Sequence, residues 1–211
     1  MPEAALAPSL VRALPASSRP LAELIERLRT PLGARGLAFG LHETTSSARP
    51  YLLAALHNAL KGQIFVVVPT TDVAERTFTD LTYYLGEHAA STVALLRARE
   101  ETLGALESPS ERSARMTLLA DLCARKPQVI VAPVAALRAY LAGGADVPEP
   151  WLALAYDERA TVVDYLHEDA LLVLEEPGML ETVEHGLDDE RARGAEVLQA
   201  GVDSGELDVR D

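Results

Sequence analysis

Residues 63–69 constrain the fold of this chain more than any other segment. Their sequence, QIFVVVP, follows Gly62 and contains an unbroken run of β-branched and aromatic residues, IFVVV. Such residues favour strands, and a strand that is apolar on both sides is covered on both faces. The segment therefore predicts an inner strand of a parallel sheet with helices on either face.

Residues 36–69 together predict one crossover unit of strand, loop, helix and strand. Residues 37–41 are short and apolar, which predicts the first strand, and residues 49–60 predict a helix that Lys61 and Gly62 end. Two neighbouring parallel strands require such a crossover connection. The unit therefore supports a parallel sheet.

Strand and helix signals continue to alternate along the chain. Helices are predicted at 20–29, at 73–85 after a cap among residues 70–72, from 108–111 to 126–127, at 134–141, and from 178 to about 199. Further strands are predicted at 91–96, 128–132 and 170–175. This order predicts a three-layer α/β fold with a mostly parallel sheet and a P-loop-type crossover.

The chain is expected to divide into four parts. Residues 1–19 contain prolines and little periodicity, which predicts a flexible arm with a turn of helix at 9–13. Residues 20–145 form the predicted α/β core. Residues 146–200 form an acidic part that returns a strand and a helix to this core, and residues 201–211 are a predicted tail or linker.

The net charge of −13 is concentrated in the last third of the chain. Residues 1–145 hold 15 basic and 13 acidic residues, whereas residues 146–211 hold 4 basic and 19 acidic residues. Acidic surfaces repel nucleic-acid backbones, which argues against DNA or RNA binding by the overall field. A basic group in the middle of the chain keeps a DNA-binding adaptor open as an alternative: Arg97, Arg99, Arg112, Arg115, Arg125 and Lys126.

The composition argues against a disulfide, a metal site and a membrane span. Cys123 is the only cysteine, and the five histidines lack ligand spacing. No apolar run approaches the roughly 20 residues that a membrane span needs. Glu3 and Arg12 interrupt any signal-like core at the N-terminus, so we expect a cytoplasmic protein.

Residues 40–47, GLHETTSS, have the spacing of a phosphate-binding P-loop but not its chemistry. A working loop is Gly-x4-Gly-Lys-Ser/Thr, in which the lysine meets the phosphates and the hydroxyl holds magnesium. Gly40 and Ser47 fit, but Thr45 stands at the second glycine and Ser46 at the lysine. We therefore expect no catalytic residue and no cofactor in this segment, although weak anion binding stays open.

Glu175 and Glu176 end the predicted strand 170–175 and resemble the acidic pair of a magnesium-binding Walker B strand. Without a lysine at position 46, we interpret the pair as vestigial. A residual nucleotide-binding enzyme that uses the loop with this pair is the alternative. Further acids lack a nucleophile beside them in the sequence: Asp157, Glu158, Glu168 and Asp169.

Several short motifs follow the degenerate loop in a fixed order: ETL at 101–103, SPSE at 108–111, VIVAPVAAL at 129–137 and DYLHEDALLVLEEPGML at 164–180. With the loop, this order resembles the N-terminal UvrB-like module of the bacterial transcription-repair coupling factor, Mfd, over residues 20–190. The resemblance implies a UvrB domain 1-like fold that has lost ATPase activity and contacts other domains of its own chain.

The resemblance also implies a longer parent protein. That protein recognises RNA polymerase stalled at DNA lesions, displaces it with an ATP- and magnesium-dependent DNA translocase, and couples this to nucleotide excision repair through UvrA. The family carries its UvrA contact on an insert between the last two motifs. Here Leu137 and Asp164 are only 27 positions apart, so no UvrA contact carries over.

Overall fold

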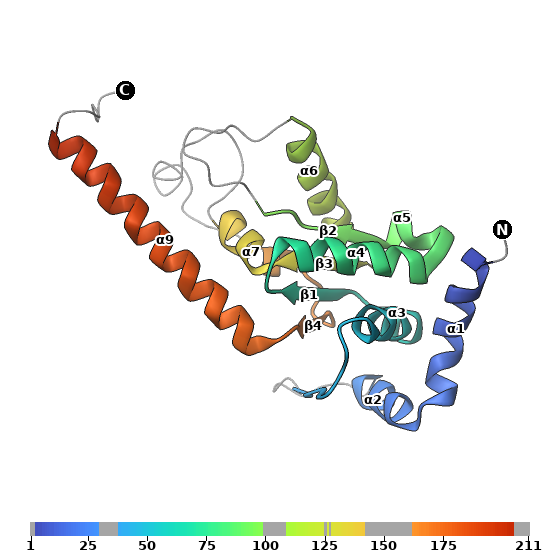
Figure 1. Cartoon of the computed structure of the whole chain (residues 1–211). Coiled ribbons are helices and arrows are strands. Elements are labelled where there is room, and N and C mark those ends of the chain that lie inside the picture. The colour runs from blue at the N-terminus through green and yellow to red at the C-terminus, as the bar shows by residue number, and fades with distance from the viewer. Residues whose placement is uncertain are drawn as a thin grey trace.

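The computed structural model describes residues 3–29, 38–98, 109–124, 126, 128–141 and 162–204. A parallel four-stranded sheet of order β2-β3-β1-β4 forms its centre (Figure 1). The strands are β1 (Ile64–Val68), β2 (Val93–Leu95), β3 (Val129–Pro133) and β4 (Leu171–Leu174). Every residue of β1 is buried, which confirms the inner parallel strand predicted from the apolar run.

Helices cover both faces of this sheet, as the predicted three-layer α/β fold requires (Figure 1). The face of Ile64 and Val66 packs against α1 (Glu3–Ser17), α2 (Arg19–Arg29), α3 (Ala48–Leu60) and α4 (Thr71–Leu85). The opposite face, with Phe65 and Val67, packs against α6 (Pro109–Cys123), α7 (Val134–Leu141), η2 (Val162–Tyr165) and the first turn of α9 (Pro177–Ser204).

Strand β4 joins the sheet beside β1, so the acidic part of the chain contributes to the same sheet as the rest. Ile64 is paired with Leu171 and Val67 with Leu174. The amide of Leu171 donates to the Gln63 carbonyl at 2.8 Å, and the amide of Glu175 donates to the Val67 carbonyl at 2.9 Å. Because β1 and β4 are parallel, their carboxyl ends meet at one edge of the sheet.

The strand predicted at residues 37–41 does not form. Residue 37 lies outside the described residues, and residues 38–41 have no secondary structure. The side chains of Phe39 and Leu41 are 36% and 52% exposed. A strand needs a hydrogen-bonded partner, and this segment pairs with none of the four described strands. Its apolar residues alone were therefore not enough to form a strand.

The prediction of a flexible N-terminal arm was wrong for residues 3–17, which form helix α1 despite Pro8 and Pro15. Val11 is fully buried in the core, and Tyr51 donates a hydrogen bond to the Leu10 carbonyl at 3.0 Å. Pro8 packs against Gly86, the first residue of the short helix η1 (Gly86–His88). Tertiary packing therefore orders a helix that its local sequence did not indicate.

Two element boundaries also differ from the sequence predictions. Residues 89–92 form a helical turn, α5 (Ala89–Thr92), so the strand predicted at 91–96 is shortened to β2. Helix α9 continues to Ser204, so residues 201–204 are helical and not part of a tail. Residues 205–211 lie outside the described residues.

Candidate functional site

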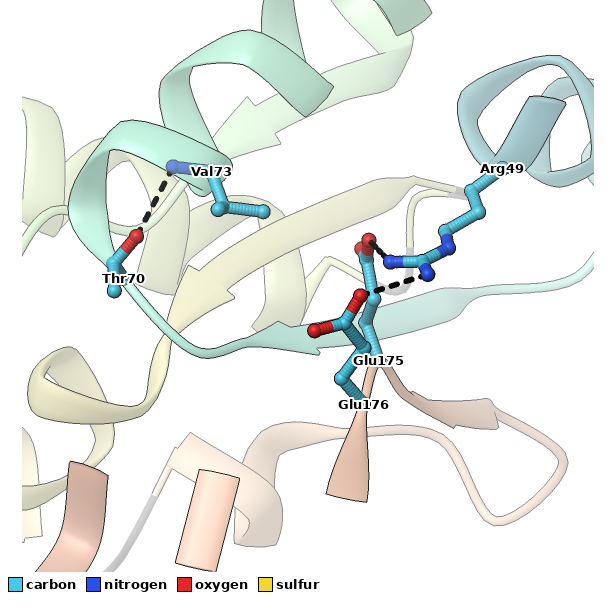
Figure 2. A network of polar contacts seen from close by, with 5 residues as sticks. All are labelled: Arg49, Thr70, Val73, Glu175 and Glu176. Carbon is cyan, nitrogen blue, oxygen red and sulfur yellow. Dashed lines mark hydrogen bonds and ion pairs between the residues drawn. The ribbon is translucent and has the colours of Figure 1, made fainter. Parts of the chain in front are cut away.

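The candidate site lies at the carboxyl edge of β1 and β4, where the loop of residues 38–47 enters helix α3 (Figure 2). Helix α3 leads directly into the start of β1, and its first turn lies at this edge, where Arg49 meets Glu175. The predicted loop and the predicted acidic pair are therefore brought to one edge, as their sequence positions suggested. Thr70, which follows β1 at the same edge, caps α4 by accepting a hydrogen bond from the Val73 amide at 3.4 Å.

Arg49 joins the two predicted acids. Its Nη1 atom donates to Oε1 of Glu175, and its Nη2 atom lies 2.8 Å from Oε1 of Glu176 (Figure 2). A guanidinium group presents two parallel donors in a rigid plane, which suits it to bind two neighbouring carboxylates at once. The hydrogen bond to Glu175, followed by the one to Glu176, raises the pKa of Arg49 above its ordinary value.

The three side chains are shielded to different degrees. Glu175 is 9% exposed, Arg49 is 23% exposed and Glu176 is 45% exposed. Glu176 has a left-handed backbone, with φ 52°, which places its carboxylate beside that of Glu175 after the strand ends. The strain of this conformation in a residue with a Cβ is offset by the shared contact with Arg49.

The loop before α3 does not present a ring of free amides. The Ala48 amide donates to the Thr45 carbonyl at 3.0 Å, and Pro50, in the first turn, has no amide hydrogen. Ser47 has helical φ and ψ angles and forms no side-chain cap. Because anions bind helix N-termini through free first-turn amides, this helix start is poorly equipped to hold a phosphate.

The side chains of the loop contact one another. The hydroxyl oxygens of Thr45 and Ser47 lie 3.4 Å apart, and Ser46 is exposed. The ring of His42 lies beside Gly40, where a Cβ atom would approach its Nε2 to 2.9 Å. Glu43 has a φ of 60° and is exposed, so it adds a negative charge to the loop.

Sequence reasoning found the two acids but missed Arg49. Only part of the signal was available. A helix that leads directly into β1 begins at the carboxyl edge of the sheet, but the meeting of Arg49 with the end of β4 depends on the strand order. Pro50 also argues against a phosphate site at this helix, because a proline in the first turn has no amide hydrogen to donate. The arrangement as a whole is an ion-paired connection between α3 and the end of β4, in which one arginine binds two carboxylates.

Part of the predicted basic group is engaged with acids of the same chain. Arg97 Nη1 lies 2.9 Å from Oε1 of Glu75, and Lys126 forms an ion pair with Asp121. Arg99, Arg125 and the side chains of Arg112 and Arg115 lie outside the described residues. The described members therefore present little unbalanced positive charge.

A second polar group lies at the opposite edge of the sheet, near the starts of β1, β3 and β4. Gln63 and Gln128 are 2% and 3% exposed, and Oε1 of Gln63 accepts a hydrogen bond from the His167 amide at 3.0 Å. In the described part of the chain, no partner is seen for His57 Nδ1, Gln63 Nε2, Gln128 Oε1 or His167 Nε2.

Burial lowers the pKa of His57. A hydrogen bond with the Gly62 backbone opposes this with a smaller effect, and the nearby charge of Lys61 lowers the pKa by a still smaller one. The unfolded chain therefore binds a proton at this site more readily than the folded chain. We expect the free energy of unfolding to fall as the pH drops below about 6.5, by at most about 1.4 kcal/mol per pH unit. Urea unfolding of wild type and His57→Gln between mildly acidic and neutral pH checks this, and the variant should lose part of the slope.

His185 provides the control for this pH dependence, because its effect has the opposite sign. A hydrogen bond with the Glu181 carbonyl raises the pKa of His185. Its stabilising contribution is present below the ordinary histidine pKa and is lost as the pH rises through the raised value. A His185→Gln variant should therefore lack the decrease in stability that His185 causes as the pH rises above about 6.5, and should leave the loss below that pH unchanged. An unchanged slope in His57→Gln contradicts the assignment.

Among the described residues, no group of three or more His, Cys, Asp or Glu side chains is arranged to hold a metal ion. Within the same ranges, no helix has both the length and the apolar character to cross a membrane. Comparisons with protein-family profiles, with curated proteins and with solved structures gave no significant match.

Proposed function

We propose that this chain is a non-catalytic interaction and regulatory module of the transcription-repair coupling factor type. The contact of Arg49 with both Glu175 and Glu176 carries the proposal. In a working P-loop enzyme the acids at this edge hold a hydrated magnesium ion, and the loop holds phosphate. Here the acids hold a side chain of their own chain, which connects helix α3 to the sheet.

The loop supports the same conclusion independently. It has Ser46 where a lysine would meet the phosphates, and the amide of Ala48 is already bonded to Thr45. Glu43 adds a charge of the wrong sign for phosphate. The frame of loop, helix and strand is therefore kept for its part in the core, because Leu53, Ala54 and Leu56 of α3 are all buried against the sheet.

The wider role follows from the order of motifs that resembles the UvrB-like module of Mfd. In this proposal the parent protein is cytoplasmic and displaces RNA polymerase stalled at DNA lesions, with ATP and magnesium bound by a separate motor. The chain itself contacts other domains of that parent and restrains the motor. UvrA recruitment is left out, because residues 137 and 164 are too close in sequence for the insert that carries it.

The restraining role is tested by deleting residues 1–211 from the longer coupling factor. We expect the ATPase rate without DNA to be unchanged or increased, because the deleted part supplies no catalytic residue and its contacts hold the motor back. The measurement is phosphate release by the intact and the shortened protein at equal motor concentration. Loss of the intrinsic ATPase activity would rule out restraint.

A residual nucleotide-binding enzyme is the alternative function, and titration calorimetry with magnesium-ATP separates the two. Micromolar binding by wild type that is lost in Ser47→Ala would favour the enzyme. Arg49→Met serves as a probe of the acids, since it frees Glu175 and Glu176 for magnesium. A DNA-binding adaptor would instead require salt-dependent binding of duplex DNA by the isolated chain.

A further inference from the structure

Strand β4 is at the edge of the sheet that the described strands form. In the strand order β2-β3-β1-β4 it is a terminal strand, and none of the other described strands pairs with its outer side. The amides of Leu171 and Glu175 donate to β1. Because alternate residues of a strand direct their backbone groups to opposite edges, the amides and carbonyls of Leu172 and Leu174 face outward.

The same two residues also expose apolar side chains. Leu172 is 54% exposed and Leu174 is 50% exposed, although their partners in the register, Phe65 and Val67, are 1% and 4% exposed. Among the described residues, the helices on this face pack against β1 and β3, and neither leucine of β4 belongs to that packed cluster. Met179, just after the strand, is also 50% exposed. Unpaired backbone groups beside exposed leucines are the features of a strand that accepts a further strand.

The charge around this edge restricts what can bind there. Residues 164–190 contain ten Asp and Glu residues and no Lys or Arg, and two of these acids, Glu175 and Glu176, bind Arg49. Glu168 and Asp169 are exposed just before β4, and Glu181 is exposed just after it. A second copy of this chain would bring the same acids together across a two-fold axis, and like charges at an interface oppose association.

The geometry points to β4 as the docking edge for an extended segment of a partner protein that alternates apolar residues with polar ones and carries lysine or arginine on its flanks. The segment adds a fifth strand, and its amides and carbonyls pair with those of Leu172 and Leu174. Its apolar side chains cover both leucines. Its basic flanks meet the acids before and after β4. This surface goes beyond the proposed regulatory role and does not depend on it.

A synthetic peptide in which valine alternates with threonine between pairs of lysines tests this proposal. We expect the labelled peptide to bind the full chain in fluorescence anisotropy, and more weakly as salt is added. One comparison peptide has proline at its central position, which removes a ladder donor, and another has glutamate in place of lysine. Both should bind at least about tenfold more weakly, a difference of about 1.4 kcal/mol.

Protein variants separate the edge from general charge effects. Leu174→Lys places a charge on the exposed face of β4 and should weaken binding at least about tenfold. Val197→Lys is the matched control, because Val197 is 72% exposed on α9, away from the strand, and adds the same charge. It should leave binding unchanged. If both variants lost peptide binding equally, the added charge alone would explain the loss, and the proposal that β4 is the docking edge would be wrong.

Hydrogen exchange provides a readout that does not depend on any variant. In the free protein the outward amides of Leu172 and Leu174 should exchange quickly, and the inward amide of Glu175 should exchange slowly. Bound peptide should slow the exchange of the Leu172 and Leu174 amides. Absence of this protection at saturating peptide, or equal binding of the proline peptide, overturns the proposal. So does concentration-dependent dimerisation that Leu174→Lys abolishes, since the occupant would then be a second copy.

Discussion

Replacing Arg49 with methionine is expected to lower the free energy of unfolding by about 2–3 kcal/mol. Methionine keeps the unbranched apolar stem of the side chain but leaves the shielded carboxylate of Glu175 beside that of Glu176 with no cation between them. Removing one partner of a fully buried ion pair costs about 3–5 kcal/mol, and the partial exposure of Arg49 and Glu176 reduces this figure. Equilibrium unfolding in urea, monitored by circular dichroism, gives the value.

A variant that removes the acids together with the arginine decides whether the uncompensated acids cause the loss of stability. The triple variant Arg49→Met, Glu175→Gln and Glu176→Gln removes all three charges together, and it should recover most of the lost stability. Arg49→Lys should be intermediate, because an ammonium group cannot bind two carboxylates with a planar pair of donors. A loss below about 0.5 kcal/mol in Arg49→Met, the level of an ordinary surface substitution, would show that the contact does not hold α3 to β4.

Replacing Gly86 with alanine is expected to cost about 3 kcal/mol of stability. Gly86 ends α4 with φ 64° and ψ −136°, a conformation that is almost restricted to glycine. An added Cβ would also lie 2.9 Å from Cγ of Pro8, whose rigid ring lies in α1. The strain of the backbone and the overlap with α1 act together, and thermal unfolding measures their sum.

Gly186→Ala is the matched control for this substitution. Gly186 lies within α9, and a Cβ there would meet nothing within 4 Å. Alanine favours a helix over glycine by about 1 kcal/mol, so this variant should be as stable as wild type or slightly more stable. If the two glycine variants lost similar stability, the special role of Gly86 would be excluded. Pro8→Ala with Gly86→Ala should recover the part of the loss due to overlap.

The inner strands and their crossover helices could be predicted because their signals are local. An apolar run such as IFVVV needs cover on both faces wherever it lies, and Thr70 caps α4 through an amide three residues away. The run LLVL of β4 carries the same signal, yet Leu172 and Leu174 remain half exposed. Composition indicates that a segment is a strand, but it does not say whether that strand lies at an edge.

Helix α1 and the Arg49 contact depended on long-range neighbours. Pro8 meets Gly86, and Arg49 meets Glu175, which is 126 positions away. Neither pairing has a periodicity or a spacing that a local pattern would detect. The acidic pair itself was predicted because it ends a strand, while its cation required the strand order and the direction of helix α3. The strand predicted at 37–41 failed for a related reason, since no described strand pairs with it.

Helix α9 has a mechanical consequence. Its 28 residues span about 42 Å at the usual rise per residue, and Leu180, near its start, is buried whereas Val197 is not. In Figure 1 the helix leans away from the sheet beyond its first turns. Gly186, Gly194 and Gly201 lie in its interior, where each weakens helical order. The helix is thus held to the core near its start. Each of the three glycines is a point at which the rest of the helix bends more easily than an unbroken helix would.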